Sequence, residues 1–376
     1  MHVPTLPFVV ALVASLTLQA EAGSELRTQN LELRTQAGSS VLSSEFSVLS
    51  SSSAQAASQA ARQRSKARPT KPIRSKEKTP PAKLPCGDLL SFEVLLDRQG
   101  FSSGQIDGTA NRNFRRALGA MRSARKIAAT GQPDCETWKA LGGDTADPAI
   151  MTYTITDEDV KGPFEKQIPH DLPEQAKLTS LAYRAPLEEI AERFHAAPSL
   201  IQKLNPGVTL AAGKTIKVPA VLPFDAGVKP PTPGSDIAKA GDISIEVSRD
   251  ESALRATRSD GTLVLFAPVT TGSEHDPLPT GDWKVTGVQW HPSFHYNPKL
   301  FWDAKAKDTK ATIKPGPNNP VGVVWIDLNL EHYGLHGTPE PGTVGLTQSH
   351  GCVRLTNWDA ARVAALVKPG TPVKFR

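Results

Sequence analysis

Apolar residues recur every three or four positions in residues 85–146, the first part of the chain that we expect to fold. Such spacing places apolar side chains on one face of a helix. It predicts a helix that begins near residue 89, a second at about 111–125 and a third that begins at 133–136. The apolar positions are Leu89, Phe92, Val94, Leu95 and Leu96 in the first helix, and Phe114, Leu118 and Met121 in the second. We therefore expect a small all-α, three-helix module.

A second segment, residues 152–220, combines helical and strand patterns. Residues 187–194 and 198–206 predict two short helices, and residues 215–219 predict a closing strand. The Asn-Pro-Gly sequence at 205–207 is typical of a turn. This segment is expected to be a small α+β module.

The C-terminal segment, residues 241–376, is dominated by strand patterns. Residues 243–247 alternate between apolar and polar positions, and residues 262–267 and 323–328 are further apolar runs. A helix is predicted at 357–367. These patterns predict a mainly β domain.

The remaining parts of the chain are predicted to lack a packed core. Residues 1–22 hold an apolar run followed by small residues, which predicts an export signal. Residues 23–84 are rich in Ser and then in basic residues and Pro, so they cannot bury enough apolar surface to fold. Residues 221–240 are expected to be a Pro/Gly-rich linker. The chain is thus expected to be multi-domain.

Composition narrows the class of protein. The 376 residues are 39% hydrophobic and 22% charged, which excludes a purely coiled-coil, collagenous or polytopic membrane protein. The formal net charge of +5 is too small to indicate a nucleic-acid partner, and we expect none.

Cys352 is the single cysteine of the C-terminal segment. In an oxidising compartment a lone thiol is either buried and inert or kept for reactivity. It follows Ser-His-Gly at 349–351, which favours a tight turn whose free amides could stabilise an oxyanion. His336 could serve as its base. The residues alone leave a Cys–His nucleophilic site and a structural thiol both open.

A metal site is the other chemistry to consider. His332 and His336 are four positions apart, as in helical metal pairs. The residues between them follow a predicted strand and include no Glu base. We therefore expect no metal and no cofactor, with a zinc peptidase as the alternative that chelation would test.

Residues 335–338 and 349–355 closely resemble the signature of L,D-transpeptidases with a YkuD-type catalytic domain. Further matches lie at 271–272, 279–281, 316–322 and 360–373. The resemblance spans the C-terminal segment. It implies a β-sandwich or barrel-like fold and an enzyme that acts on peptidoglycan stem peptides.

The resemblance also implies residue roles. Cys352 would attack the carbonyl between the third and fourth residues of a stem peptide, and His336 would activate the thiol. The backbone carbonyl of Gly337 would orient the imidazole, and Arg354 would bind a substrate carboxylate. The remaining expected site residues are Gly351, Cys352 and His350 at the oxyanion hole, and Ser349 and Thr338 in substrate binding.

The two smaller modules resemble wall-binding domains. Residues 85–146 are similar to a three-helix peptidoglycan-binding module, and residues 152–220 resemble a LysM-type sugar-binding repeat. Residues 182–186 stand where the LysM opening strand is expected. Cys86 and Cys135 bracket the three-helix module, and a disulfide between them would stabilise it by roughly 2–4 kcal/mol. That disulfide would leave Cys352 unpaired.

These observations predict an exported enzyme of the periplasm or cell wall. It would transfer a stem peptide from Cys352 to an amine, forming 3→3 cross-links, or attaching protein where the acceptor is a lipoprotein. Its expected partners are stem peptides and glycan strands, with carbapenems as covalent inhibitors. The alternatives are an L,D-carboxypeptidase that uses water at the same thiol, and a non-catalytic wall anchor.

Overall fold

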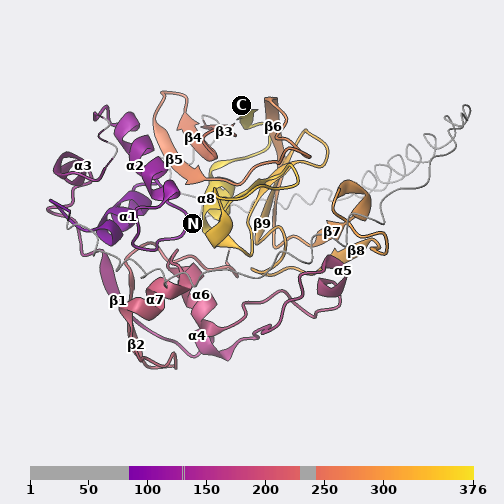
Figure 1. Cartoon of the computed structure of the whole chain (residues 1–376), viewed down its shortest axis with the longest axis horizontal. Coiled ribbons are helices and arrows are strands. Elements are labelled where there is room, and N and C mark those ends of the chain that lie inside the picture. Colours follow the sequence, from indigo (N-terminus) through magenta and orange to yellow (C-terminus); the bar gives the residue numbers. More distant parts are fainter. Residues whose placement is uncertain (1–83, 129, 131, 229–242) are drawn as a thin grey trace, which may run out of the picture. The chain divides into compact units, whose positions relative to one another are not determined.

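The structure is a computed structural model that describes residues 84–128, 130, 132–228 and 243–376 (Figure 1). The expected export signal, nearly all of the expected spacer at 23–84 and much of the linker at 221–240 lie outside these residues. Among the described helices, none combines the length and the apolar character needed to cross a bilayer.

The first described elements are three helices, α1 (Leu89–Arg98), α2 (Arg112–Ala124) and α3 (Cys135–Ala140). Each begins where a side chain accepts a hydrogen bond from the first turn, and the capping residues are Asp88, Asn111 and Asp134. Their apolar faces form a shared core that includes Phe92, Phe114 and Leu118. A disulfide joins Cys86, just before α1, to Cys135, the first residue of α3.

The next elements surround a two-stranded antiparallel sheet. Strand β1 (Ile150–Thr154) pairs with β2 (Thr215–Pro219). The helices between these strands are α4 (Glu158–Lys161), α5 (Leu172–Gln175), α6 (Pro186–Arg193) and α7 (Pro198–Leu204). The opening strand therefore lies at 150–154, ahead of the expected boundary at 152, and not at 182–186. Residues 155–185, which include α4 and α5, separate it from α6.

Within the described residues, the C-terminal part forms an eight-stranded sheet of order β11-β10-β9-β6-β12-β3-β4-β5. Its strands are β3 (Ile243–Ser248), β4 (Ala253–Arg258), β5 (Leu263–Pro268), β6 (Gly281–Trp290), β9 (Val324–Leu328), β10 (Gly334–His336), β11 (Val353–Arg354) and β12 (Pro372–Phe375). A small hairpin, β7 (Phe294–Tyr296) and β8 (Ala311–Ile313), stands apart from it. The mainly β architecture is confirmed.

The two ends of the large sheet meet. Immediately after β5, the Thr270 backbone exchanges hydrogen bonds with the Arg354 backbone of β11, at 2.9 and 3.0 Å. The first and last strands in the order are thereby joined, as in a barrel. This closure brings the 270–272 loop beside the turn that precedes β11.

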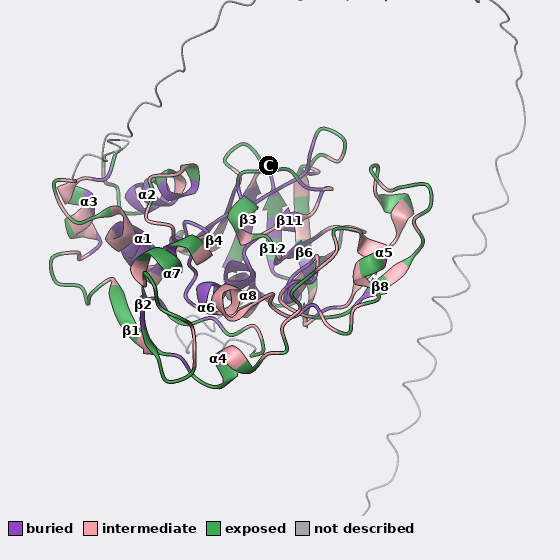
Figure 2. Cartoon of the chain, turned by 60° about the horizontal axis from the view of Figure 1, so that its bottom comes forward, coloured by how far each residue is buried: buried purple, intermediate pink, exposed green. Residues whose placement is uncertain are grey.

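Helix α8 (Asn357–Leu366) packs inside this arrangement, and most of its length is buried (Figure 2). Thr356 caps its N-terminus by accepting from the Asp359 N–H. Its apolar side chains, including Val363 and Leu366, join the core formed by the strands. Two 3₁₀ turns, η1 (Pro298–Leu300) and η2 (Pro341–Thr343), lie in the surrounding loops.

The three-helix group covers strand β5. The Ser102 N–H donates to the Phe266 carbonyl and the Phe266 N–H donates to the Gly100 carbonyl, each at 2.8 Å. Figure 1 shows α2 beside β5. Asp97 of α1 is buried and accepts from the Arg362 guanidinium of α8 at 2.8 and 3.0 Å.

Candidate active site

Strands β10 and β11 fix the relative placement of the candidate residues. They run parallel, with Leu335 opposite Val353 and His336 opposite Arg354. Side chains alternate along a strand, and paired residues share a face. Leu335 and Val353 belong to the hydrophobic core, so His336 and Arg354 occupy the opposite face, together with Cys352 just before β11.

These three side chains line one cavity of about 680 Å³. Its wall also includes Trp325 of β9 and Tyr333 before β10. The far side is formed by the loops around β7 and β8 and by residues 170–172 at the start of α5. The cavity is large enough for a peptide segment and is built by segments far apart in the sequence.

The imidazole of His336 is held in one tautomer. Its Nδ1 lies 2.6 Å from the Gly337 carbonyl oxygen. A carbonyl only accepts, so Nδ1 carries the proton and Nε2 keeps a free lone pair. Burial, with a smaller contribution from the Arg354 charge, lowers the pKa of His336 to about 3. His336 is therefore a neutral base near pH 7, and the Trp325 ring stacks on it at 5.4 Å.

Cys352 is the free thiol of the described residues and is partly buried. Its Sγ donates to the His332 carbonyl at 3.5 Å. Burial raises the pKa of the Cys352 thiol, while the Gly334 backbone N–H and the Arg354 charge act in the opposite direction. The thiol and the imidazole are thus each favoured in the neutral form, because burial opposes charge on both.

Gly351 adopts a φ of +100°, a conformation that favours glycine. A Cβ there would lie 2.8 Å from the Tyr333 ring, so this ring covers the turn before the thiol. His350 lines the cavity, and its Nε2 lies 2.9 Å from Asp303 Oδ1. This contact attaches the turn to the β7–β8 loop.

Arg354 is the cation beside the thiol. Burial lowers the pKa of its guanidinium, and its Nε is buried without a hydrogen-bond partner among the described residues. An unpaired buried donor is costly unless a ligand supplies an acceptor. Arg354 is therefore able to bind an incoming anion.

Two of the expected substrate-binding residues lie outside the lining of this cavity. Ser349 and Thr338 are buried and do not line the cavity. The Ser349 hydroxyl donates to the Cys352 carbonyl at 2.7 Å, and the Thr338 hydroxyl accepts from the Glu340 N–H at 3.3 Å. Each hydroxyl stabilises a turn through a hydrogen bond to nearby backbone, as Ser and Thr side chains often do.

The far rim of the cavity contains a contact that the sequence patterns missed. Lys305, in the loop before β8, donates to Asp171 at 2.8 Å, just before α5. Figures 1 and 2 both show α5 beside β8. Neither residue belongs to a motif, and no signal in the sequence pairs them.

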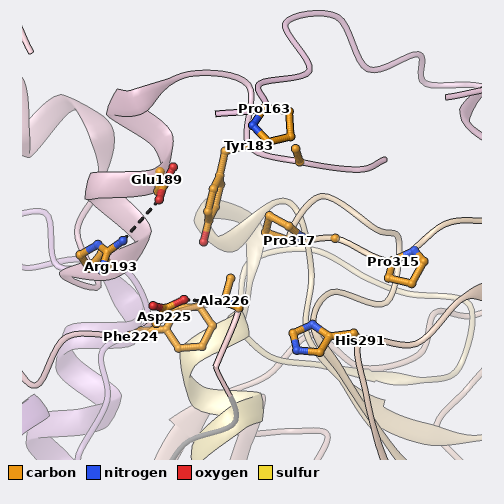
Figure 3. Close-up of a pocket in the computed structure, with 13 residues that line it drawn as sticks. Pro163, Tyr183, Glu189, Arg193, Phe224, Asp225, Ala226, His291, Pro315 and Pro317 are labelled. Atoms are coloured by element: carbon orange, nitrogen blue, oxygen red, sulfur yellow. Dashed lines mark hydrogen bonds and ion pairs between the residues drawn. The ribbon is translucent and has the colours of Figure 1, made fainter. Parts of the chain in front are cut away.

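A second, smaller cavity of about 390 Å³ lies between α6 and the 315–317 loop (Figure 3). Tyr183 stands between Glu189 and Arg193 on one side and Pro317 on the other. Arg193 Nη2 lies 3.3 Å from Glu189 Oε1. The Tyr183 hydroxyl donates to Glu192 Oε1 at 3.1 Å.

Comparison with known proteins places this fold and site in a class. Residues 242–375 match the family model described as the YkuD L,D-transpeptidase catalytic domain. The C-terminal part of the chain belongs to this family of enzymes.

Curated relatives have the same family name. The putative L,D-transpeptidase YkuD of Bacillus licheniformis is 28% identical over 192 residues, which cover 50% of this chain and 92% of the relative. The probable L,D-transpeptidase YbiS of Escherichia coli is 27% identical over 199 residues, which cover 50% of this chain and 60% of the relative. Both alignments are longer than the matched catalytic domain, so they reach upstream of residue 242.

Among solved structures, an L,D-transpeptidase from Mycobacterium smegmatis is 18% identical, with a TM-score of 0.30, and the match covers 36% of this chain and 58% of the other. L,D-transpeptidase 3 from Mycobacterium tuberculosis, in complex with a faropenem-derived adduct, is 16% identical with a TM-score of 0.30, covering 36% and 60%. These partial superpositions add nothing to the assignment made from the family model.

Proposed function

We propose that the protein is an exported L,D-transpeptidase that remodels peptidoglycan in the periplasm or cell wall. The observation that carries the proposal is the orientation of His336, whose Nδ1 is bound to the Gly337 carbonyl while Cys352 lines the same cavity. A neutral imidazole with a free Nε2 is suited to take the thiol proton as sulfur attacks.

Acylation would proceed through proton transfer within this pair. Sγ of Cys352 bonds to the carbonyl carbon of the peptide bond between the third and fourth residues of a stem peptide. The thiol proton moves to His336 Nε2. The C–N bond to the terminal D-residue then breaks, and the imidazolium gives that proton to the leaving amine. The backbone N–H groups of Gly351 and Cys352, with His350 nearby, would stabilise the oxyanion of the tetrahedral intermediate.

Transfer would reverse the order of proton movement. A neutral acceptor amine attacks the thioester, His336 takes one N–H proton, the C–S bond breaks and the sulfur regains a proton from the imidazolium. Arg354, with its unpaired Nε, would bind a substrate carboxylate. The acceptor would be another stem peptide or a lipoprotein, and water would give a carboxypeptidase product.

The two smaller modules would hold the enzyme on glycan strands. Their helices and paired strands support the peptidoglycan-binding-like and LysM-like assignments. Such binding raises the local concentration of stem peptides at the catalytic cavity.

Intact mass after incubation with meropenem tests the nucleophile. Wild type should gain the mass of one carbapenem, and Cys352→Ala should gain none. An adduct on the Ala variant, or none on wild type, would contradict the proposal. With a tetrapeptide donor, a cross-linked dimer identifies transfer, whereas tripeptide alone identifies hydrolysis.

A further inference from the structure

Glu192 connects α6 with the catalytic domain. It is 6% exposed, and its Oε1 accepts from the Asn357 side-chain amide at 2.9 Å and from the Tyr183 hydroxyl at 3.1 Å. Asn357 is the first residue of α8 and is fully buried. A buried polar contact between segments so distant in sequence is expensive to break, so it fixes the Asn357 side chain.

Asn357 in turn packs against the backbone around the catalytic histidine. Its Oδ1 accepts from the Val323 N–H at 3.2 Å, and its Nδ2 also donates to the Pro317 carbonyl at 3.1 Å. A Cβ on Gly337 would lie 2.1 Å from this Oδ1, and one on Gly322 would lie 2.0 Å from it. Both glycines allow the amide to rest directly on the main chain.

Gly337 is the residue whose carbonyl holds His336 Nδ1. The contacts therefore form a continuous path from Glu192 through Asn357 and Gly337 to the catalytic imidazole. We infer that Glu192 and Asn357 are positioning residues that keep the Gly337 carbonyl aligned with His336. The segment that resembles a sugar-binding repeat thus supplies part of the support for catalysis. The inference rests on the proposed function.

The chemistry at Glu192 favours a neutral hydrogen-bonding role. Burial raises the pKa of its carboxyl to about 8, and the nearby Glu188 charge raises it further, whereas Asn357 and Tyr183 act against the rise. The group is then a carboxylic acid near pH 7. A glutamine has the same shape and the same acceptor oxygen, so Glu192→Gln should preserve the path.

The test compares acylation by meropenem in full-length variants. Glu192→Met keeps the buried volume but removes the acceptor oxygen. It should lower the maximal acylation rate by about tenfold, with the half-saturating meropenem concentration within about twofold of wild type. Glu192→Gln should acylate within about twofold of wild type. Glu189→Ala, on the same helix, is the matched control and should leave acylation unchanged.

A double-mutant cycle separates positioning from general loosening. If the effect of Glu192 passes through Asn357, Glu192→Met combined with Asn357→Ala should be no slower than Asn357→Ala alone. Wild-type acylation by Glu192→Met, or losses that multiply in the double variant, would overturn the inference. If Glu192→Met does not fold, Asn357→Ala decides: it must lower the maximal rate, and an unchanged rate refutes the path. A wild type that forms no adduct would instead overturn the proposed function.

Discussion

His336 Nδ1 lies 2.6 Å from the carbonyl oxygen of Gly337. The imidazole is therefore oriented by a backbone dipole and not by a carboxylate. A carbonyl selects the tautomer but adds no negative charge that would stabilise an imidazolium. With Arg354 nearby and little solvent, the histidine remains neutral until substrate arrives.

The first prediction concerns pH. Because the pKa of His336 is lowered to about 3, the neutral base persists well below the ordinary histidine range near 6.5. Acylation by meropenem should therefore lose less than about half its rate between pH 7 and pH 5 through protonation of the base. Stopped-flow or mass-resolved rates across this range provide the measurement. A tenfold or larger drop with a midpoint near 6.5 would contradict the neutral-base account.

The second prediction concerns the space at Gly337. A Cβ there would lie 2.1 Å from Asn357 Oδ1, so Gly337→Ala must displace a buried amide or the carbonyl that holds His336. We expect a loss of about 1–3 kcal/mol in the free energy of unfolding and at least about a hundredfold slower acylation.

The matched control is Gly119→Ala in α2, where an added Cβ meets nothing within 4 Å. This substitution should raise stability by up to about 1 kcal/mol and leave acylation unchanged. Equal effects from the two glycine variants would show that the clash at Gly337 is absent.

The third prediction concerns the buried ion pair between α1 and α8. Asp97 is 1% exposed at its side chain, and Arg362 lies 2.8 Å away. Asp97→Ala removes a carboxylate that balances the charge of the partly buried Arg362 guanidinium. Urea unfolding should therefore show a loss of about 3–5 kcal/mol in the free energy of unfolding. The exposed pair of Lys374 and Asp282, 3.7 Å apart, offers the comparison. Lys374→Ala should cost less than about 1 kcal/mol.

The pH dependence of the same pair has a defined sign. The Arg362 and His195 charges hold the pKa of Asp97 well below its usual range against the effect of burial. Its contribution to stability is present above the unfolded pKa near 4 and is lost as pH falls toward the folded value. The stability difference between wild type and Asp97→Asn should therefore shrink under acid conditions. A difference that grows below pH 4 would contradict this assignment.

The fourth prediction concerns Glu192. Its folded pKa is about 8 against an ordinary value of 4.5, so the folded protein keeps a proton that the unfolded chain releases. Wild type should lose stability relative to Glu192→Gln as pH rises from 4.5 to 8, by roughly 2–5 kcal/mol in total. Unfolding at pH 5 and pH 8.5 measures the difference. The exposed residue Glu158 supplies the control variant, Glu158→Gln, which should change the free energy of unfolding at pH 5 by less than about 0.5 kcal/mol.

Patterns along the chain predicted the elements with strong local signals. Helices α1, α2 and α8 and strands β3, β5 and β9 lie where periodicity indicates them. Strand β1 was not predicted, because its residues are nearly all exposed and no alternation of buried and exposed positions marks it. It is held by backbone pairing to β2, a contact that hydrophobic patterning cannot report.

The sequence predicted only part of the site, because only some of its residues lie close together along the chain. The spacing of His336 and Cys352 is a local motif, and both residues line the same cavity. Glu192 and Asn357 lie far apart in sequence and become partners only after folding. The sequence does not distinguish a buried helical glutamate from an exposed one. The role of Glu192 is therefore visible only in its contacts in the folded protein.

Residues 100–102 cover strand β5, and this contact affects how a shortened version of the protein should be designed. A fragment that starts at the catalytic domain would leave the β5 backbone groups of Phe266 unpaired at the rim. Unprotected rims of this kind recruit strands from other copies and promote aggregation. Recombinant fragments should therefore retain the N-terminal helices if soluble, monodisperse material is wanted.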